Sequence, residues 1–474
     1  MTTGRTVIGR HGEGFLETRG DMTVLHVKGA PYKRGRQHGA LLAPRVTATV
    51  SRGLTGAAAV TALALGCSVE QGFIRLCQGR DEASGFLPDE LREEMQGMAD
   101  ALKEAGSPLG FEDILLWNTM YDSWCFFAHP DPSDPAAQYR HEPHTIGCCS
   151  FSAWGTATHD GKLLFAKNMD NLDLPGILEG RLLVICDPEQ GFGHVNVTHP
   201  GMLAIDGGFN ENGIEMMTHY SPSVRETMRG CGIGTFSRLI LQRASTVEDA
   251  AAICAGFPRC TGINYHVADA KTNRAAVIEC DAGDTAVRHP FKEDMLWSTN
   301  HYNCYPGWRG YKGLNMVERQ QPVFKLHDIS SAAAWQESLR DTSNSLIDAA
   351  GRFRRLEKLL DEHQGTLDAE AAMEILRDRH HPDTGELRPW DVPARGRNDG
   401  VTISFSLARK TFSEKARFYK SKEAARITGQ TGNLWAMVAT PASGDFHVAM
   451  SDFPAHRGPF LHFNLREELR RKAE

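Results

Sequence analysis

The chain has 474 residues, of which 41% are hydrophobic and 23% are charged. This length and composition allow a large core and roughly two to four domains, and they exclude a disordered protein. The net charge of −7 comes from 52 basic and 59 acidic residues mixed along the chain, so a basic face for nucleic acid and a polybasic membrane segment are both excluded. We therefore expect small binding partners, no nucleic acid and no membrane.

The sequence shows no clear signal for targeting to a membrane or for a metal site. The N-terminal residues lack the pattern of a secretion signal, and the most apolar stretch, residues 54–67, is too short to span a bilayer. The 11 cysteines show no C-x-x-C spacing, which argues against a disulfide framework and a zinc ribbon. The sequence favours a soluble, cytoplasmic protein with reduced cysteines, no cofactor and no metal.

The first 125 residues or so are predicted to be mainly helical. Residues 87–106 place apolar side chains at helical spacing and end at Gly106, and residues 107–122 repeat the pattern. Residues 126–146 contain four prolines and no periodicity, which predicts an exposed linker.

From Cys148 onward the hydrophobic period changes to two residues. His159-Asp160-Gly161 is typical of a tight turn and predicts a hairpin between two strands. Strands and helices then follow in blocks instead of alternating strictly, which indicates an α+β fold. Further strands are expected within 181–220, 263–280, 400–408 and 433–453, and helices within 234–256, 345–363 and 367–379.

Two adjacent cysteines, Cys148 and Cys149, follow Gly147 at the start of the first of these strands. A cysteine attacks as a thiolate and needs a base or a positively charged site to ionise near neutral pH. One interpretation is that the pair alternates across the strand and that one thiol is simply part of the core. Another is a conventional cysteine hydrolase with His301 as its base, although papain-like nucleophiles open a helix and not a strand.

A third interpretation uses Gly147. If the bond between Gly147 and Cys148 were cut, the α-amine of Cys148, with a pKa near ~7.7 to 8.0, would be a base suited to neutral pH. The thiol could make this cut itself, because a residue without a Cβ permits close approach to its carbonyl. A zinc site formed by His141, His144 and the two cysteines is a weaker interpretation, because adjacent cysteines seldom bind one tetrahedral metal together.

Several motifs occur in order between about residues 25 and 305: "VKGAPYKRGRQHGALLA", "FEDILLWNTMYD", "GCCSFSAWGTATHDGKLLFAKNMD", "GGFNENGIEMMTHY", "CTGINYHVADAKTNRAAVIE" and "WSTNHY". In this order they resemble the N-terminal-nucleophile (Ntn) hydrolases of the penicillin acyltransferase group. This is a self-cleaving family of cysteine acyltransferases and hydrolases, distantly similar to bile-salt hydrolases and penicillin V acylases.

The resemblance implies roles for individual residues. Cys148 would be the nucleophile and, once freed by cleavage after Gly147, the base through its amine. Asp170 would orient the nucleophile, and the side-chain amide of Asn264 would stabilise the oxyanion. A backbone N–H near His219 or Tyr220 would be the second oxyanion donor. Lys167 stands where many relatives have arginine. Arg352 matches a family arginine loosely.

Without the resemblance, simpler roles are favoured for some of these residues. Asp170 suits a turn, and Asn264 suits a residue that caps its own backbone. Lys167 keeps the positive charge of an arginine but lacks its planar fork. Asn300 and His301 are expected to orient the sheet without taking part in chemistry.

The resemblance implies a four-layer αββα sandwich with antiparallel sheets. Residues 1–147 would be a mainly helical pro-segment that stays associated as a small subunit, and residues 148–474 would be the catalytic region. The expected reaction is cleavage or transfer of an acyl group from an amide or thioester of a small molecule, with an amine or a carrier-bound thioester as further candidate partners. The alternatives are a conventional Cys–His hydrolase without self-cleavage and a non-catalytic binding protein of the same fold.

Overall fold

The computed structural model describes residues 4–128, 147–172, 177, 180–290, 292–304, 316–317, 347–380, 384–387 and 431–471. Most of the predicted linker and the predicted strand at 400–408 lie outside these residues, as do His141 and His144. Within the described part of the chain, no helix combines the length and the apolar character needed to cross a membrane.

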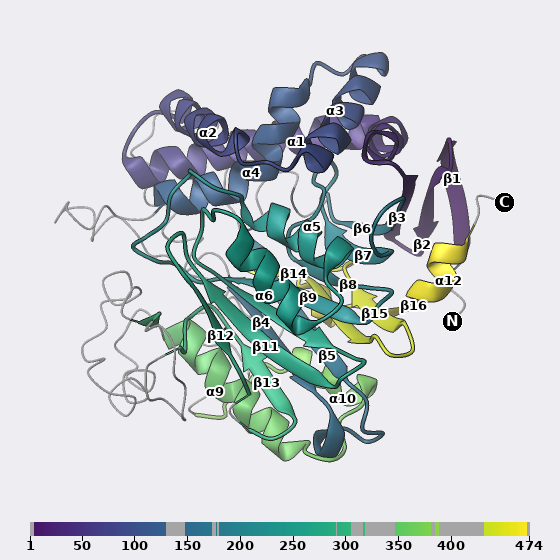
Figure 1. The fold of residues 1–474 in the computed structure, drawn as a ribbon, viewed down its shortest axis with the longest axis vertical. Coiled ribbons are helices and arrows are strands. Elements are labelled where there is room, and N and C mark those ends of the chain that lie inside the picture. Colours follow the sequence, from purple (N-terminus) through teal and green to yellow (C-terminus); the bar gives the residue numbers. More distant parts are fainter. Residues whose placement is uncertain are drawn as a thin grey trace.

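Two β-sheets lie face to face in the middle of the molecule (Figure 1). The larger has the strand order β1 (Arg5–His11), β2 (Gly14–Arg19), β3 (Met22–Gly29), β6 (Leu182–Pro188), β7 (His194–Thr198), β8 (Gly207–Asn210), β9 (Ile214–Tyr220), β10 (Ile263–Asp269), β11 (Arg274–Cys280) and β12 (Thr285–Arg288). The smaller has the order β13 (Met295–Ser298), β4 (Gly147–Ala153), β5 (Leu164–Leu172), β14 (Thr431–Thr440), β15 (Asp445–Ala449) and β16 (Leu461–Asn464). The described strands pair antiparallel, except that β3 and β6 are parallel.

Helices cover the outer face of each sheet (Figure 1). Helices α5 (Ile233–Arg243) and α6 (Val247–Gly256) pack on the larger sheet, and α9 (Ile347–Glu362) and α10 (Ala369–Leu376) pack on the smaller one. The predicted four-layer αββα sandwich is therefore confirmed. Helices α1 (Pro31–Leu65), α2 (Val69–Ser84), α3 (Asp89–Glu104) and α4 (Phe111–Ala128) form a bundle that contacts β1–β3 and α5, and α12 (Leu465–Arg470) follows β16.

The N-terminal segment is more than the predicted helical unit, because it begins with strands β1–β3. These strands belong to the larger sheet, and β3 pairs along its length with β6. The period-two pattern is hidden in β2 because two of its buried residues, Glu17 and Arg19, are charged. The segments before and after Gly147 thus share one sheet.

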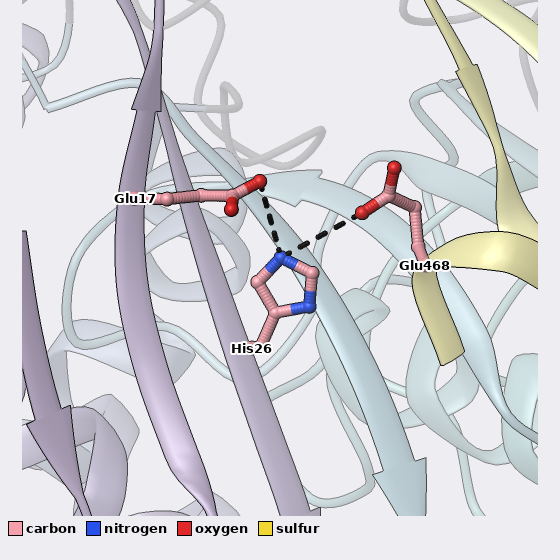
Figure 2. A group of neighbouring side chains, drawn as sticks. All are labelled: Glu17, His26 and Glu468. Carbon is pink, nitrogen blue, oxygen red and sulfur yellow. Dashed lines mark ion pairs between the residues drawn. The ribbon is translucent and has the colours of Figure 1, made fainter. Parts of the chain in front are cut away.

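A buried charge cluster joins strands β2 and β3 to helix α12, near the two ends of the chain (Figure 2). His26 Nε2 lies 3.5 Å from a carboxylate oxygen of Glu17 and 3.8 Å from one of Glu468. Arg19 donates to both carboxylates, at 2.8 Å to Glu17 and 2.7 Å to Glu468, and Arg5 also donates to Glu17. Burial lowers the pKa of His26, so the arginines and not the imidazole balance the carboxylates at neutral pH.

The composition of this cluster would suit a metal ion, but its charges do not. Arg19 already occupies oxygen atoms of Glu17 and Glu468, and a divalent cation would sit beside that guanidinium. We therefore interpret the cluster as a structural tie between the N-terminal strands and the C-terminal helix.

The charge cluster predicts a pH-dependent contribution to stability. Burial raises the pKa of Glu17, but the neighbouring His26, the hydrogen bond from Arg5 and the charge of Arg19 outweigh it and lower the pKa to about 2. Because this lies below the unfolded value, the stabilisation is present above about pH 4.5 and is lost as the pH falls toward about 2. Glu17→Gln should lower the free energy of unfolding by about 2 kcal/mol at neutral pH and by much less near pH 3, measured by denaturant unfolding.

Glu104→Gln is the matched control, because Glu104 pairs with Arg36 on the exposed surface. It should change stability little at any pH. A Glu17→Gln effect that stays constant between neutral pH and pH 3 would contradict the assignment.

Candidate active site

The β4–β5 hairpin presents the two cysteines on opposite faces of the smaller sheet. Cys148 pairs with Met169 and Cys149 with Asn168 across the hairpin. Cys148 shares its face with Ser150, whose hydroxyl lies 2.7 Å from Nδ1 of His266 on the larger sheet. Cys149 packs on the other side, with the apolar residues of α9 and α10. Of the two cysteines, Cys148 is therefore the one that faces the space between the sheets.

The backbone of Cys148 is held by a ring of hydrogen bonds. Its N–H donates to Asn300 Oδ1 at 2.8 Å, and its carbonyl accepts from Arg352 Nη1 at 2.6 Å. The second arm of Arg352 donates to the same Asn300 oxygen at 2.9 Å. Asn300 Nδ2 in turn donates to the carbonyl of Tyr220 at 2.8 Å. The first residues of β4 are thus fixed to β9, α9 and the segment after β13.

The Cys148 thiol is buried and lies beside sulfur. Its Sγ is 3.3 Å from Met169 Sδ, and the residue is only 2% exposed. Burial raises the pKa of the thiol to about 11, although the charges of Lys167 and Arg352 lower it. At neutral pH the thiol of the uncut chain is therefore protonated, and a nucleophilic role requires a base.

The two charged residues predicted on β5 lie on this part of the hairpin. Lys167 is buried and donates from Nζ to the carbonyls of Thr218 at 2.5 Å and Asp206 at 3.1 Å. Asp170 pairs with Gly147 across the hairpin, and its Oδ1 accepts from Asn433 Nδ2 at 3.0 Å. Lys167 therefore supplies a fixed positive charge that points toward the larger sheet.

The predicted oxyanion donors are engaged elsewhere in this structure. Asn264 Nδ2 donates to the carbonyls of Thr299 at 3.1 Å and His301 at 2.9 Å. His219 and Tyr220 lie inside the β9–β10 ladder, where His219 pairs with Asn264. Asn264 thus supports the turn that carries Asn300, and a direct role for its amide would require one of these hydrogen bonds to exchange.

The structure does not favour His301 as a base. Its Nδ1 lies 3.0 Å from Thr299 Oγ1, and its ring packs edge-on against Phe353 at 5.1 Å between centroids. Burial, together with the charges of Arg288 and Arg352, lowers the pKa of His301 to about 3. A histidine with this pKa cannot accept a proton efficiently near neutral pH.

A zinc site on both cysteines is also disfavoured. Cys148 and Cys149 point to opposite faces of β4, so one metal ion cannot bind both thiols. The two histidines of that interpretation lie outside the described residues.

Three residues near Cys148 had no assigned chemical role in the sequence: Asn300, Asp206 and Asn433. Asn300 contacts Cys148 directly, Asp206 binds Lys167 through its carbonyl, and Asn433 binds Asp170. Asn300 lies in the "STNHY" motif, and this motif is the sequence feature that could mark it. The other two stand in segments far from the hairpin in sequence, and no local pattern marks them.

Comparisons with known proteins agree with the motifs. Residues 156–398 match the family model described as acyl-coenzyme A:6-aminopenicillanic acid acyl-transferase. A protein of Archaeoglobus fulgidus, described only as uncharacterized, is 26% identical over 372 residues, which are 76% of this chain and 58% of that protein. This chain therefore spans less than two thirds of the length of that relative.

Two solved structures show remote similarity. A mutant of the conjugated bile acid hydrolase from Clostridium perfringens is 13% identical, with a TM-score of 0.39 over 68% of this chain and 94% of that one. The Caenorhabditis elegans ortholog of N-acylethanolamine-hydrolyzing acid amidase is 13% identical, with a TM-score of 0.34 over 62% of this chain and 93% of that one.

The hydrogen-bonded ring predicts that Arg352 is needed for stability. Arg352→Met leaves the carbonyl of Cys148 without its donor, and it should lower the free energy of unfolding by about 3 kcal/mol. Lys358→Met, at an exposed position of the same helix, should cost less than about 0.5 kcal/mol. Denaturant unfolding measures both, and equal effects of the two substitutions would show that the ring does not stabilise the chain.

Proposed function

The chain belongs to the acyl-coenzyme A:6-aminopenicillanic acid acyltransferase family, and on this premise we propose that it is a self-processing cysteine enzyme that forms an acyl-enzyme on Cys148. The placement of Cys148 carries the proposal. Its thiol faces the space between the sheets, while Asn300 and Arg352 hold its N–H and its carbonyl. These are the positions that a nucleophile and a newly formed N-terminal amine require.

In the proposed maturation step, the Cys148 thiol attacks the carbonyl carbon of Gly147. The C–N bond between the two residues breaks, a thioester forms, and the released amine takes the proton of the thiol. Water then hydrolyses the thioester, which gives a carboxylate on Gly147 and a free thiol and amine on Cys148. Asn300 Oδ1, which accepts from the Cys148 N–H in the uncut chain, would then accept from this amine.

In the proposed turnover, the amine is the base that the buried thiol lacks. It takes the thiol proton, and the thiolate attacks the acyl carbon of the substrate. The departing group takes the proton, and the acyl-enzyme is resolved by water or by an amine. Asp170 would orient the nucleophile, and Asn264 with a backbone N–H near His219 or Tyr220 would stabilise the oxyanion after exchange of its present partner.

The proposed substrates are small acyl donors. The family description names an acyl thioester and an amine acceptor, so we propose an amide or thioester as donor and an amine or water as acceptor. The loops that would select the acyl group are not specified by these motif residues.

Several contacts support a small subunit that stays bound after cleavage. Strand β3 pairs with β6 on the other side of the cleavage site. Glu94 of α3 forms a buried ion pair with Arg238 of α5 at 3.0 Å, and Asp122 of α4 accepts from Ile233 N at the start of α5. Removing residues 1–147 would break this ladder and leave Arg238 without its carboxylate partner.

A test of the nucleophile compares Cys148→Ala with Cys149→Ala. Cys148→Ala should remain a single chain and gain no acetyl group from p-nitrophenyl acetate on the peptide that contains residue 148. Cys149→Ala should mature and be acetylated within about threefold of the wild-type rate, because its thiol packs against α9 and α10. Mass spectrometry measures both results, and normal maturation of Cys148→Ala would refute the proposal.

A further inference from the structure

Asp206, directly before β8, is a buried acid near Cys148 that no motif assigns. Its Oδ2 atom is buried without a hydrogen-bond partner among the described residues. A buried carboxylate oxygen without a donor is costly unless nearby charges compensate it. The charged groups around Asp206 therefore bear on how its buried carboxylate is tolerated.

The backbone of Asp206 is anchored to the residues around Lys167. Its carbonyl accepts from Lys167 Nζ at 3.1 Å, from Thr218 N at 3.1 Å and from Thr218 Oγ1 at 3.2 Å. Trp435 on β14, in the opposite sheet, also acts on the carboxyl group of Asp206 and lowers its pKa. The ring of Trp435 lies 5.5 Å from Lys167 Nζ. Asp206, Lys167 and Trp435 thus form one unit across the space between the sheets.

Lys167 and Asp206 act on the Cys148 thiol with opposite signs. The positive charge of Lys167 lowers the pKa of a thiol that burial has raised, and the negative charge of Asp206 raises it further. Burial raises the pKa of Asp206 itself to about 6, against the lowering effects of Lys167 and Trp435, so the carboxyl group is mostly ionised at neutral pH. Among the described residues, further titratable or charged groups act on this unit or on the thiol: Asp170 from β5, Arg352 from α9, Tyr121 from α4, His219 from β9, His266 from β10 and Cys149 from β4.

We propose that Asp206 is a positioning residue of the Cys148 centre, whose carboxylate counters the charge of Lys167 and limits the fraction of thiolate at Cys148. The inference rests on the proposed function only in taking Cys148 as the reactive thiol, and it does not require self-cleavage. A thiol that stays protonated until the acyl donor arrives keeps the proton that the departing amine needs. Asp206 would thereby link activation of the nucleophile to protonation of the leaving group.

The test measures the rate at which iodoacetamide alkylates Cys148 between about pH 6 and about pH 12, a range that includes the thiol pKa of about 11. Full-length wild type, Asp206→Asn and Lys167→Met are compared by mass spectrometry of the peptide that contains residue 148. Asp206→Asn should react about tenfold faster at pH 7, with its inflection at lower pH, because the thiolate fraction rises tenfold per pKa unit. Lys167→Met should react about tenfold more slowly at the same pH. A merely loosened fold would accelerate both variants.

Glu215→Gln is the matched control. Glu215 is a buried carboxyl group on β9 with no hydrogen-bond partner among the described residues, and burial raises its pKa well above the usual value. Burial thus favours the uncharged form of Glu215, so its substitution removes a buried carboxyl group with little loss of charge. Glu215→Gln should keep the wild-type alkylation profile, as should Asp206→Glu, which keeps the charge.

An unchanged inflection in Asp206→Asn, or a shift in the same direction in both main variants, would overturn the inference. If Asp206→Asn does not fold, Lys167→Met still tests the inference. A Lys167→Met protein whose Cys148 is alkylated as fast as in wild type, or faster, would show that the two charges do not act on the thiol in opposite directions. The intact mass of each sample separates this result from the proposed function. An uncut chain with the expected opposite shifts would contradict self-cleavage and leave the role of Asp206 standing.

Discussion

The ring of hydrogen bonds among Cys148, Asn300 and Arg352 is the constraint on which the site depends. Cys148 is the second residue of an inner strand, and its N–H and carbonyl are both bound by side chains from elements far along the chain. Arg352 suits this task because its planar fork reaches the carbonyl of Cys148 and the oxygen of Asn300 together. The start of β4 is therefore positioned by α9 and by the segment after β13.

This geometry explains how one residue could act in two steps. In the uncut chain, burial keeps the thiol protonated, and the neighbouring histidines are neutral because burial also lowers their pKa. Cleavage would create an amine where the N–H of Cys148 now meets Asn300, so the missing base would appear beside the thiol without any movement of the sheets. The surrounding charges of Lys167, Arg352 and two aspartates then set how readily the thiol ionises.

Periodicity predicts the α+β fold and the alternation of the two cysteines, whereas the four layers and the role of Cys148 are implied by the family resemblance. The switch to period two at Cys148 places one cysteine between the sheets and the other against helices, as alternation in a strand requires. Strands β1–β3 were not predicted, since the buried Glu17 and Arg19 remove the hydrophobic alternation from β2. Their burial depends on Glu468, about 450 residues away, which no local pattern reveals.

At the candidate active site, too, the sequence predicts some of the residues but not their contacts. The motif that contains Asn300 was visible in the sequence, but spacing alone could not show that Asn300 and not Asn264 meets Cys148. Asp206 reaches the centre through the gap between two sheets, and such a contact follows from the stacking of layers and not from order along the chain.

Self-cleavage before Cys148 is tested directly by the intact mass and the N-terminal sequence of the purified wild-type protein. If the chain cuts itself there, the 52.3 kDa precursor gives two associated chains of about 16 and about 36 kDa, and the larger begins Cys-Cys-Ser-Phe. A larger chain beginning Cys-Ser-Phe would transfer the role to Cys149. A single uncut chain that is nevertheless acylated at Cys148 and turns over would show that self-cleavage is not needed for activity and would refute the proposed self-processing.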